Sequence, residues 1–153
     1  MFWLKSGLFA VGLGMSFVYA IIPPLARDLG LSEIQASFIF SLSAVAWAMT
    51  SAPWGRASDK YGRRNIAILG YIGYSISMII LILPIYLADK NILSAAFVFP
   101  LLILGRTIYG LLGSATRPAS FAYIADITPN SQRTKKCARV ESHFLFGTLV
   151  VPL

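Results

Sequence analysis

Four apolar runs, each long enough to cross a lipid bilayer as a helix, constrain this chain more than any other feature. A hydrocarbon core of about 30 Å requires roughly 20 apolar residues in helical conformation. The runs cover residues 8–26, 36–54, 66–88 and 92–125, and only the last contains charged residues, Arg106 and Arg117. A fifth run begins near Phe144 and reaches Leu153. We therefore predict an all-α integral membrane protein with four complete spans and part of a fifth, at approximately residues 7–26, 36–54, 66–88, 96–124 and 141–153.

Composition supports the same class of protein. The mean hydropathy of +0.72 and the charged fraction of 12% lie outside the range of soluble domains. The first run resembles a secretory signal in one respect, because Lys5 precedes it. It is longer than a signal core, has no small-x-small cleavage pattern and ends at Pro23-Pro24. We therefore interpret it as a retained span.

Basic residues concentrate in two of the predicted loops. The loops after the second and fourth spans each contain four lysines or arginines, whereas the loops after the first and third each contain one. The eight residues are Arg56, Lys60, Arg63, Arg64, Arg133, Lys135, Lys136 and Arg139. Because basic loops stay on the cytoplasmic side, we predict a multi-pass protein of the plasma (bacterial inner) membrane with a cytoplasmic amino terminus. The lipid bilayer then accounts for the net charge of +7 without a nucleic-acid partner.

Residues 55–64, GRASDKYGRR, include residues that the orientation of the chain in the membrane does not explain. Topology needs only basic side chains, yet this stretch also places glycines at positions 55 and 62 and an aspartate at position 59. A glycine at a helix end lets another backbone approach closely. A carboxylate there can complement the positive amino end of a neighbouring helix. The combination predicts a contact between helices at the membrane surface.

The stretch resembles the signature loop between the second and third helices of the major facilitator superfamily, G-x-L-a-D-r-x-G-r-k, and departs from it at Ala57. Pro53-Trp54 and the segment PPLARDLGLSEIQASFIFSL are also similar to this superfamily, in particular to its drug:proton antiporter branch. The segment YIADITPNSQR resembles the end of the family's fourth helix. Together these resemblances imply a conformational latch made by Gly55, Asp59, Lys60, Gly62, Arg63, Arg64 and Asp126.

Within this latch, the resemblance implies two separate contacts. Arg63 is expected to pair with Asp126. Asp59 is expected to engage a helix of the other half of the carrier, and so to have no partner in this chain. The alternative for Asp126 is a charge that simply marks a membrane boundary.

A second motif, Arg106-Thr107-Ile108-Tyr109-Gly110, lies inside the fourth span. A buried arginine at that depth costs roughly 2.5–3.5 kcal/mol on insertion scales unless it faces a polar interior. The motif resembles the family's fourth-helix pattern R-x-x-q-G, with Tyr109 in place of glutamine, and the resemblance implies that Arg106 and Gly110 take part in proton coupling. The alternative is a structural arginine that reaches the interface or pairs with a backbone carbonyl.

The resemblance also sets expectations for the whole molecule. Family members have twelve spans in two six-helix halves, with the substrate site between the halves, so residues 1–153 correspond to an incomplete amino-terminal half. The carboxyl-terminal half is then a missing partner, and we expect no transport by this chain alone. Val151 occupies a glycine position of the antiporter pattern in the fifth helix, before Pro152. Residues 6–26 contain no acidic residue, which leaves Asp28, Glu33 or sequence outside this chain as the proton carrier.

The resulting functional hypothesis is a secondary active transporter, driven by protons, that exports drug-like or amphiphilic solutes. One alternative is a proton-coupled carrier of a metabolite, sugar or siderophore. Another is a membrane fragment that does not transport and serves assembly. The sequence offers no Ser-His-Asp set, no phosphate-binding loop and no cysteine–histidine pair, and Cys137 is its single cysteine. We therefore expect no enzyme activity, no catalytic residues, no metal and no cofactor.

Overall fold

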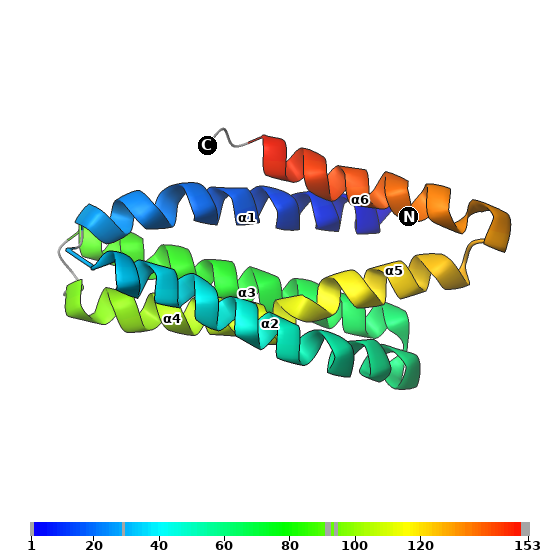
Figure 1. The fold of residues 1–153 in the computed structure, drawn as a ribbon, viewed down its shortest axis with the longest axis horizontal. Coiled ribbons are helices and arrows are strands. Elements are labelled where there is room, and N and C mark those ends of the chain that lie inside the picture. Colours follow the sequence, from blue (N-terminus) through cyan, green and yellow to red (C-terminus); the bar gives the residue numbers. More distant parts are fainter. Residues whose placement is uncertain (1, 29, 91–92, 94, 151–153) are drawn as a thin grey trace.

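The computed structural model describes residues 2–28, 30–90, 93 and 95–150, and every element in these residues is helical (Figure 1). The elements are α1 (Phe2–Asp28), α2 (Glu33–Tyr61), α3 (Arg63–Asp89), α4 (Ala95–Leu112), the 3₁₀ turn η1 (Gly113–Ala115), α5 (Thr116–Asp126), the 3₁₀ turn η2 (Asn130–Gln132) and α6 (Arg133–Leu149). Val151 and Pro152, and with them the end of the predicted fifth span, lie outside the described residues.

Four stretches are long and apolar enough to cross a membrane: Trp3–Asp28, Glu33–Tyr61, Arg63–Ala88 and Phe97–Asp126. The prediction of an all-α membrane protein with four complete spans is therefore confirmed. Large apolar side chains on one side of α3, at Ile72, Ile79 and Ile82, are 52%, 63% and 58% exposed. Their spacing places them on one helix face, and exposed aliphatic groups in such a row are suited to contact with lipid rather than water.

The helices extend beyond the apolar runs at both ends. The amino end of α2 is closed by a capping box, in which Ser32 Oγ accepts from the Gln35 amide (3.2 Å) and Gln35 Oε1 accepts from the Ser32 amide (2.9 Å). At its other end α2 continues to Tyr61 through residues that the sequence analysis assigned to a loop. That boundary was wrong because charge was used to end the helix, although arginine, alanine and lysine all favour helical conformation.

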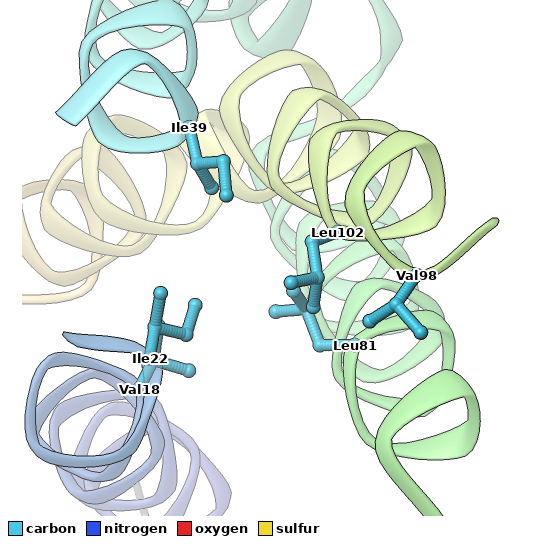
Figure 2. Packing of buried hydrophobic residues seen from close by; sticks show 6 residues of the cluster. All are labelled: Val18, Ile22, Ile39, Leu81, Val98 and Leu102. Atoms are coloured by element: carbon cyan, nitrogen blue, oxygen red, sulfur yellow. The ribbon is translucent and has the colours of Figure 1, made fainter. Parts of the chain in front are cut away.

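Successive spans run in opposite directions between the two ends of the bundle (Figure 1). Figure 1 shows the amino terminus, the α2–α3 junction and the α5–α6 connection at one end, and the last turns of α1 and α3 with the first turns of α2 and α4 at the other. Helix α4 packs against both α2 and α3, and α1 packs chiefly against α6. Figure 2 shows one buried cluster near the α1–α2 connection, to which four helices contribute: Val18, Ile22, Ile39, Leu81, Val98 and Leu102.

The fourth span is interrupted by η1, just before Pro118 in α5. A proline has no amide hydrogen and its ring clashes with the carbonyl four residues earlier, so the regular helical ladder fails in this segment. Two side chains of α2 donate to carbonyls beside the break. Trp54 Nε1 lies 2.6 Å from the Leu111 oxygen, and Thr50 Oγ1 lies 3.0 Å from the Gly110 oxygen. The bend in the fourth span is thus held against α2.

Candidate functional site

The α2–α3 junction holds the first group of predicted site residues. Arg63, the first residue of α3, places its Nε 2.7 Å from Asp126 Oδ2 at the last residue of α5. Its Nη2 lies 3.1 Å from Asp59 Oδ1. One guanidinium therefore contacts two carboxylates, and the ends of α2, α3 and α5 meet at it.

Gly62 makes this junction possible. It is the single residue between α2 and α3, and its φ of +93° lies in a region that side-chain-bearing residues rarely adopt. Two long helices can therefore reverse direction over one residue. This tight turn brings Arg63, the first residue of α3, close to Asp59 near the end of α2, where the pair forms.

The structure brings together Arg63 and Asp126, as the sequence resemblance implies. The expectation that Asp59 lacks a partner in this chain is wrong, because Arg63 contacts it as well. The expectation failed because it treated residues 55–64 as a loop. With α2 helical to Tyr61 and α3 starting at Arg63, the two charged residues lie on either side of Gly62, and the reversal of the chain there brings their side chains together.

The other latch residues lie around this centre without joining the ion pairs. Lys60 places its ammonium 5.3 Å from the centre of the Tyr61 ring. Arg64 borders an open hollow of about 690 Å³ that Asp59 and Asp126 also line. Gly55 lies inside α2, and a Cβ built on it meets no atom within 4 Å. No other described residue therefore packs closely against Gly55.

Arg106 lies in α4 and is only 2% exposed. Its Nε and Nη1 atoms have no hydrogen-bond partner in the described part of the chain, and no carboxylate there is within ion-pair distance of it. Three aromatic rings surround its charged carbon instead, with centres at 4.9 Å (Tyr109), 5.2 Å (Phe40) and 5.9 Å (Tyr19). Aromatic faces attract a cation, but they return only part of the hydration that burial removes.

Gly110 lies one helical turn after Arg106 and faces α2. A Cβ at this position would lie 2.6 Å from the Ser43 carbonyl oxygen and 2.7 Å from the Ala46 Cβ. Thr50 Oγ1 reaches the Gly110 carbonyl at the same contact. The absence of a side chain therefore sets the distance between α2 and α4, and through it the position of Arg106 against the rings of α1 and α2.

A cavity of about 270 Å³ lies beside Arg106, between residues of α1, α2, α4, α5 and α6. Aromatic side chains make up a large part of its wall: Tyr19, Phe40, Trp47, Tyr109 and Phe144. The Tyr19 and Phe40 rings are stacked at 5.1 Å with an interplanar angle of 12°. Tyr109 donates its hydroxyl hydrogen to the Met15 sulfur at 2.9 Å, which fixes its ring in the wall.

Arg117 also lines this cavity, and sequence reasoning missed its partner. Its Nη2 donates to Oε1 of Glu141 in α6, and its charged carbon lies 4.7 Å from the centre of the Phe144 ring. The sequence alone gave Arg117 no partner. An arginine inside one apolar run and a glutamate at the start of the next were the available signal. The two carboxylates that sequence favoured for proton transfer, Asp28 and Glu33, line neither hollow described above.

Comparison with known proteins places these features in a family. The sequence model of the Major Facilitator Superfamily matches residues 6–153. Multidrug resistance protein 2 of Bacillus subtilis is 27% identical over 149 residues, which are 97% of this chain and 34% of that protein. Quinolone resistance protein NorA of Staphylococcus aureus is 27% identical over 150 residues, which are 95% of this chain and 36% of that protein. The chain thus spans about a third of the length of the curated relatives it matches.

Proposed function

The chain belongs to the major facilitator superfamily of membrane transporters, and we propose that its helices serve a secondary active carrier that exports drug-like or amphiphilic solutes in exchange for protons. The observation that carries this proposal is Arg106, a charge buried in a membrane span beside an aromatic cavity. Such a charge is costly in a purely structural role. It is useful in a carrier, where charge must be moved or compensated during each cycle.

The relatives support export rather than import. Both are named for resistance to drugs, one to multiple drugs and one to quinolones. The cavity has the aromatic, weakly polar wall that suits amphiphilic organic molecules. In this proposal the substrate and protons are the partners of the carrier, and the ion pairs of Arg63 hold one conformation of it at the cytoplasmic surface.

Transport assays in everted vesicles test the proposal directly. The reading frame that encodes residues 1–153, taken through to its stop codon, is expressed in a host whose own drug exporters are deleted. Vesicles are energised, and a fluorescent pH probe reports proton release when an aromatic drug is added. Proton release that depends on the added drug, and that is lost with Arg106→Gln, supports proton-coupled export.

Two results would contradict it. Drug movement without proton movement would remove the coupling, and a sugar or metabolite that competes for transport would favour the alternative carrier class. Arg139→Gln serves as the matched control, because Arg139 is exposed and lies outside the cavity lining.

A further inference from the structure

The cavity beside Arg106 has a charge balance that favours one class of ligand. Of the described residues that line it, two are arginines, Arg106 and Arg117, and none is acidic. Arg117 is neutralised by Glu141, whereas no described carboxylate pairs with Arg106, which lies among the rings of Tyr19, Phe40 and Tyr109. Among the described residues, the wall therefore carries one positive charge without a carboxylate partner, on a side chain that is only 2% exposed, and electrostatic interactions of a buried charge are stronger than in water.

The hydrogen-bonding capacity of Arg106 gives the same indication. A guanidinium has five N–H donors and no acceptor, and two of its nitrogen atoms have no partner among the described residues. Buried donors without partners carry a desolvation penalty. An anion that enters the cavity would accept hydrogen bonds from the unpaired N–H groups of Arg106. It would also compensate the positive charge of that side chain, as a carboxylate does in an ion pair.

The aromatic residues of the wall determine which ligand shapes fit the cavity. Rings from α1, α2, α4 and α6 line the cavity, and two of them, Tyr19 and Phe40, are stacked. Planar aromatic surfaces pack well against such rings. The volume of about 270 Å³ is near the lower end for small-molecule sites, which suits a ligand of a few fused rings rather than a long flexible chain.

We propose that this cavity binds planar aromatic anions, with the carboxylate or sulfonate of the ligand paired to Arg106 and its rings against Tyr19, Phe40 and Tyr109. This assignment rests on the proposed function and narrows its substrate class from amphiphilic solutes in general to aromatic acids. An organic cation is disfavoured in the same cavity, because it would lie beside Arg106. The same anionic chemistry can also come from an acidic side chain of another polypeptide segment, and the test separates these two sources.

The test uses three probes that share one ring system: naphthoate, naphthylmethanol and naphthylmethylammonium. Equilibrium dialysis measures their binding to the 153-residue chain in nanodiscs of uncharged phospholipid, with binding to empty nanodiscs subtracted. We expect naphthoate to bind about tenfold or more tightly than the alcohol, and the ammonium to bind less tightly than the alcohol. No ion gradient is needed, so this result is independent of whether transport occurs.

Three variants locate the effect. Arg106→Gln is expected to abolish the preference for naphthoate while naphthylmethanol binding remains. Phe40→Leu is expected to weaken naphthoate and naphthylmethanol by similar factors, because it removes a ring but no charge. Arg139→Gln removes one exposed positive charge outside the cavity lining and is expected to change nothing. Thermal unfolding of each variant in the same nanodiscs excludes loss of fold as the cause.

Each remaining outcome overturns the assignment. Equal binding of the three probes, or tighter binding of the ammonium, would overturn the ligand class. A naphthoate preference that persists in Arg106→Gln would overturn the site. No binding of any probe would overturn the assignment of the cavity to a small aromatic anion and leave an acidic side chain of another polypeptide segment as the alternative partner of Arg106. Proton-coupled export of an organic cation would overturn the ligand class while leaving the proposed function intact.

Discussion

The Nε atom of Arg63 lies 2.7 Å from Oδ2 of Asp126, so the first turn of α3 is joined to the last turn of α5. The same guanidinium also contacts Asp59. Three helix ends therefore depend on the position of one side chain. Both carboxylates remain more than half exposed, at 54% for Asp126 and 65% for Asp59.

Exposed ion pairs of this kind contribute little to the stability of a fold. We predict that Asp126→Asn and Asp59→Asn each lower the free energy of unfolding by about 1 kcal/mol or less, because water screens these charges. Denaturant unfolding in micelles measures this change. If the pairs act as a conformational latch, the same variants reduce transport by a much larger factor in the everted-vesicle assay. A loss of several kcal/mol would instead show that the pairs hold the fold.

The two glycines of the stretch at residues 55–64 are predicted to respond to alanine with opposite signs. Gly62→Ala forces a Cβ into a backbone conformation at φ +93°, which costs roughly 1–2 kcal/mol. Gly55→Ala adds a methyl group in open space within α2 and should stabilise the helix by about 0.5–1 kcal/mol. Thermal unfolding of the two variants side by side provides the measurement. Destabilisation by Gly55→Ala would reveal a close neighbour at that position that these residues do not supply.

The membrane spans and the ion pairs of Arg63 differ in how far they could be predicted from the sequence. The spans were predictable because their length and apolarity are fixed by bilayer thickness, whatever the packing. The contact between Arg63 and Asp126 was implied by a motif that spans two distant segments. The contact of Asp59 with Arg63 was missed, because it depends on α2 staying helical up to Gly62 and on a reversal over one residue.

The cavity was beyond sequence reasoning for a different physical reason. Its wall draws on five helices, four of which supply aromatic rings, and the rotation of these helices about their axes decides which rings face inward. Arg117 and Glu141 are 24 positions apart, and they meet only because the chain reverses between α5 and α6. No short spacing in the sequence encodes such a pair.

Gly110 provides a test of how closely α2 and α4 must pack. Gly110→Ala would place a methyl group within 2.7 Å of Ala46 Cβ, so one helix must move, and we predict a loss of about 1–3 kcal/mol in unfolding free energy. Thr50→Val removes the hydroxyl that contacts the Gly110 carbonyl and Ser114 Oγ across the same interface, and it should cost less, about 0.6 kcal/mol. Unfolding in micelles compares the two. An equal loss in both variants would indicate that the hydrogen bond, and not the close approach, holds the helices together.

The two arginines of the fourth span are predicted to differ in what their removal does to stability. Arg117→Gln leaves Glu141 without its partner, and Glu141 Oε2 is already buried without a hydrogen bond. We expect a loss of about 1–3 kcal/mol, below the value for a fully buried pair because both side chains keep some exposure. The double variant Arg117→Gln/Glu141→Gln should recover part of this loss, because no charge is then left alone.

Arg106→Gln is expected to leave the unfolding free energy unchanged or to raise it. Arg106 has no carboxylate partner among the described residues, so its removal strands no opposite charge and relieves an uncompensated one. Thermal unfolding in nanodiscs without added ligand compares it with Arg117→Gln. In the presence of naphthoate this difference between the two variants should shrink or reverse, because Arg117→Gln retains Arg106 and gains stability from the bound anion, whereas Arg106→Gln does not. A loss in Arg106→Gln as large as that in Arg117→Gln, without ligand, would mean that Arg106 is held by the protein itself and is not free to bind an anion.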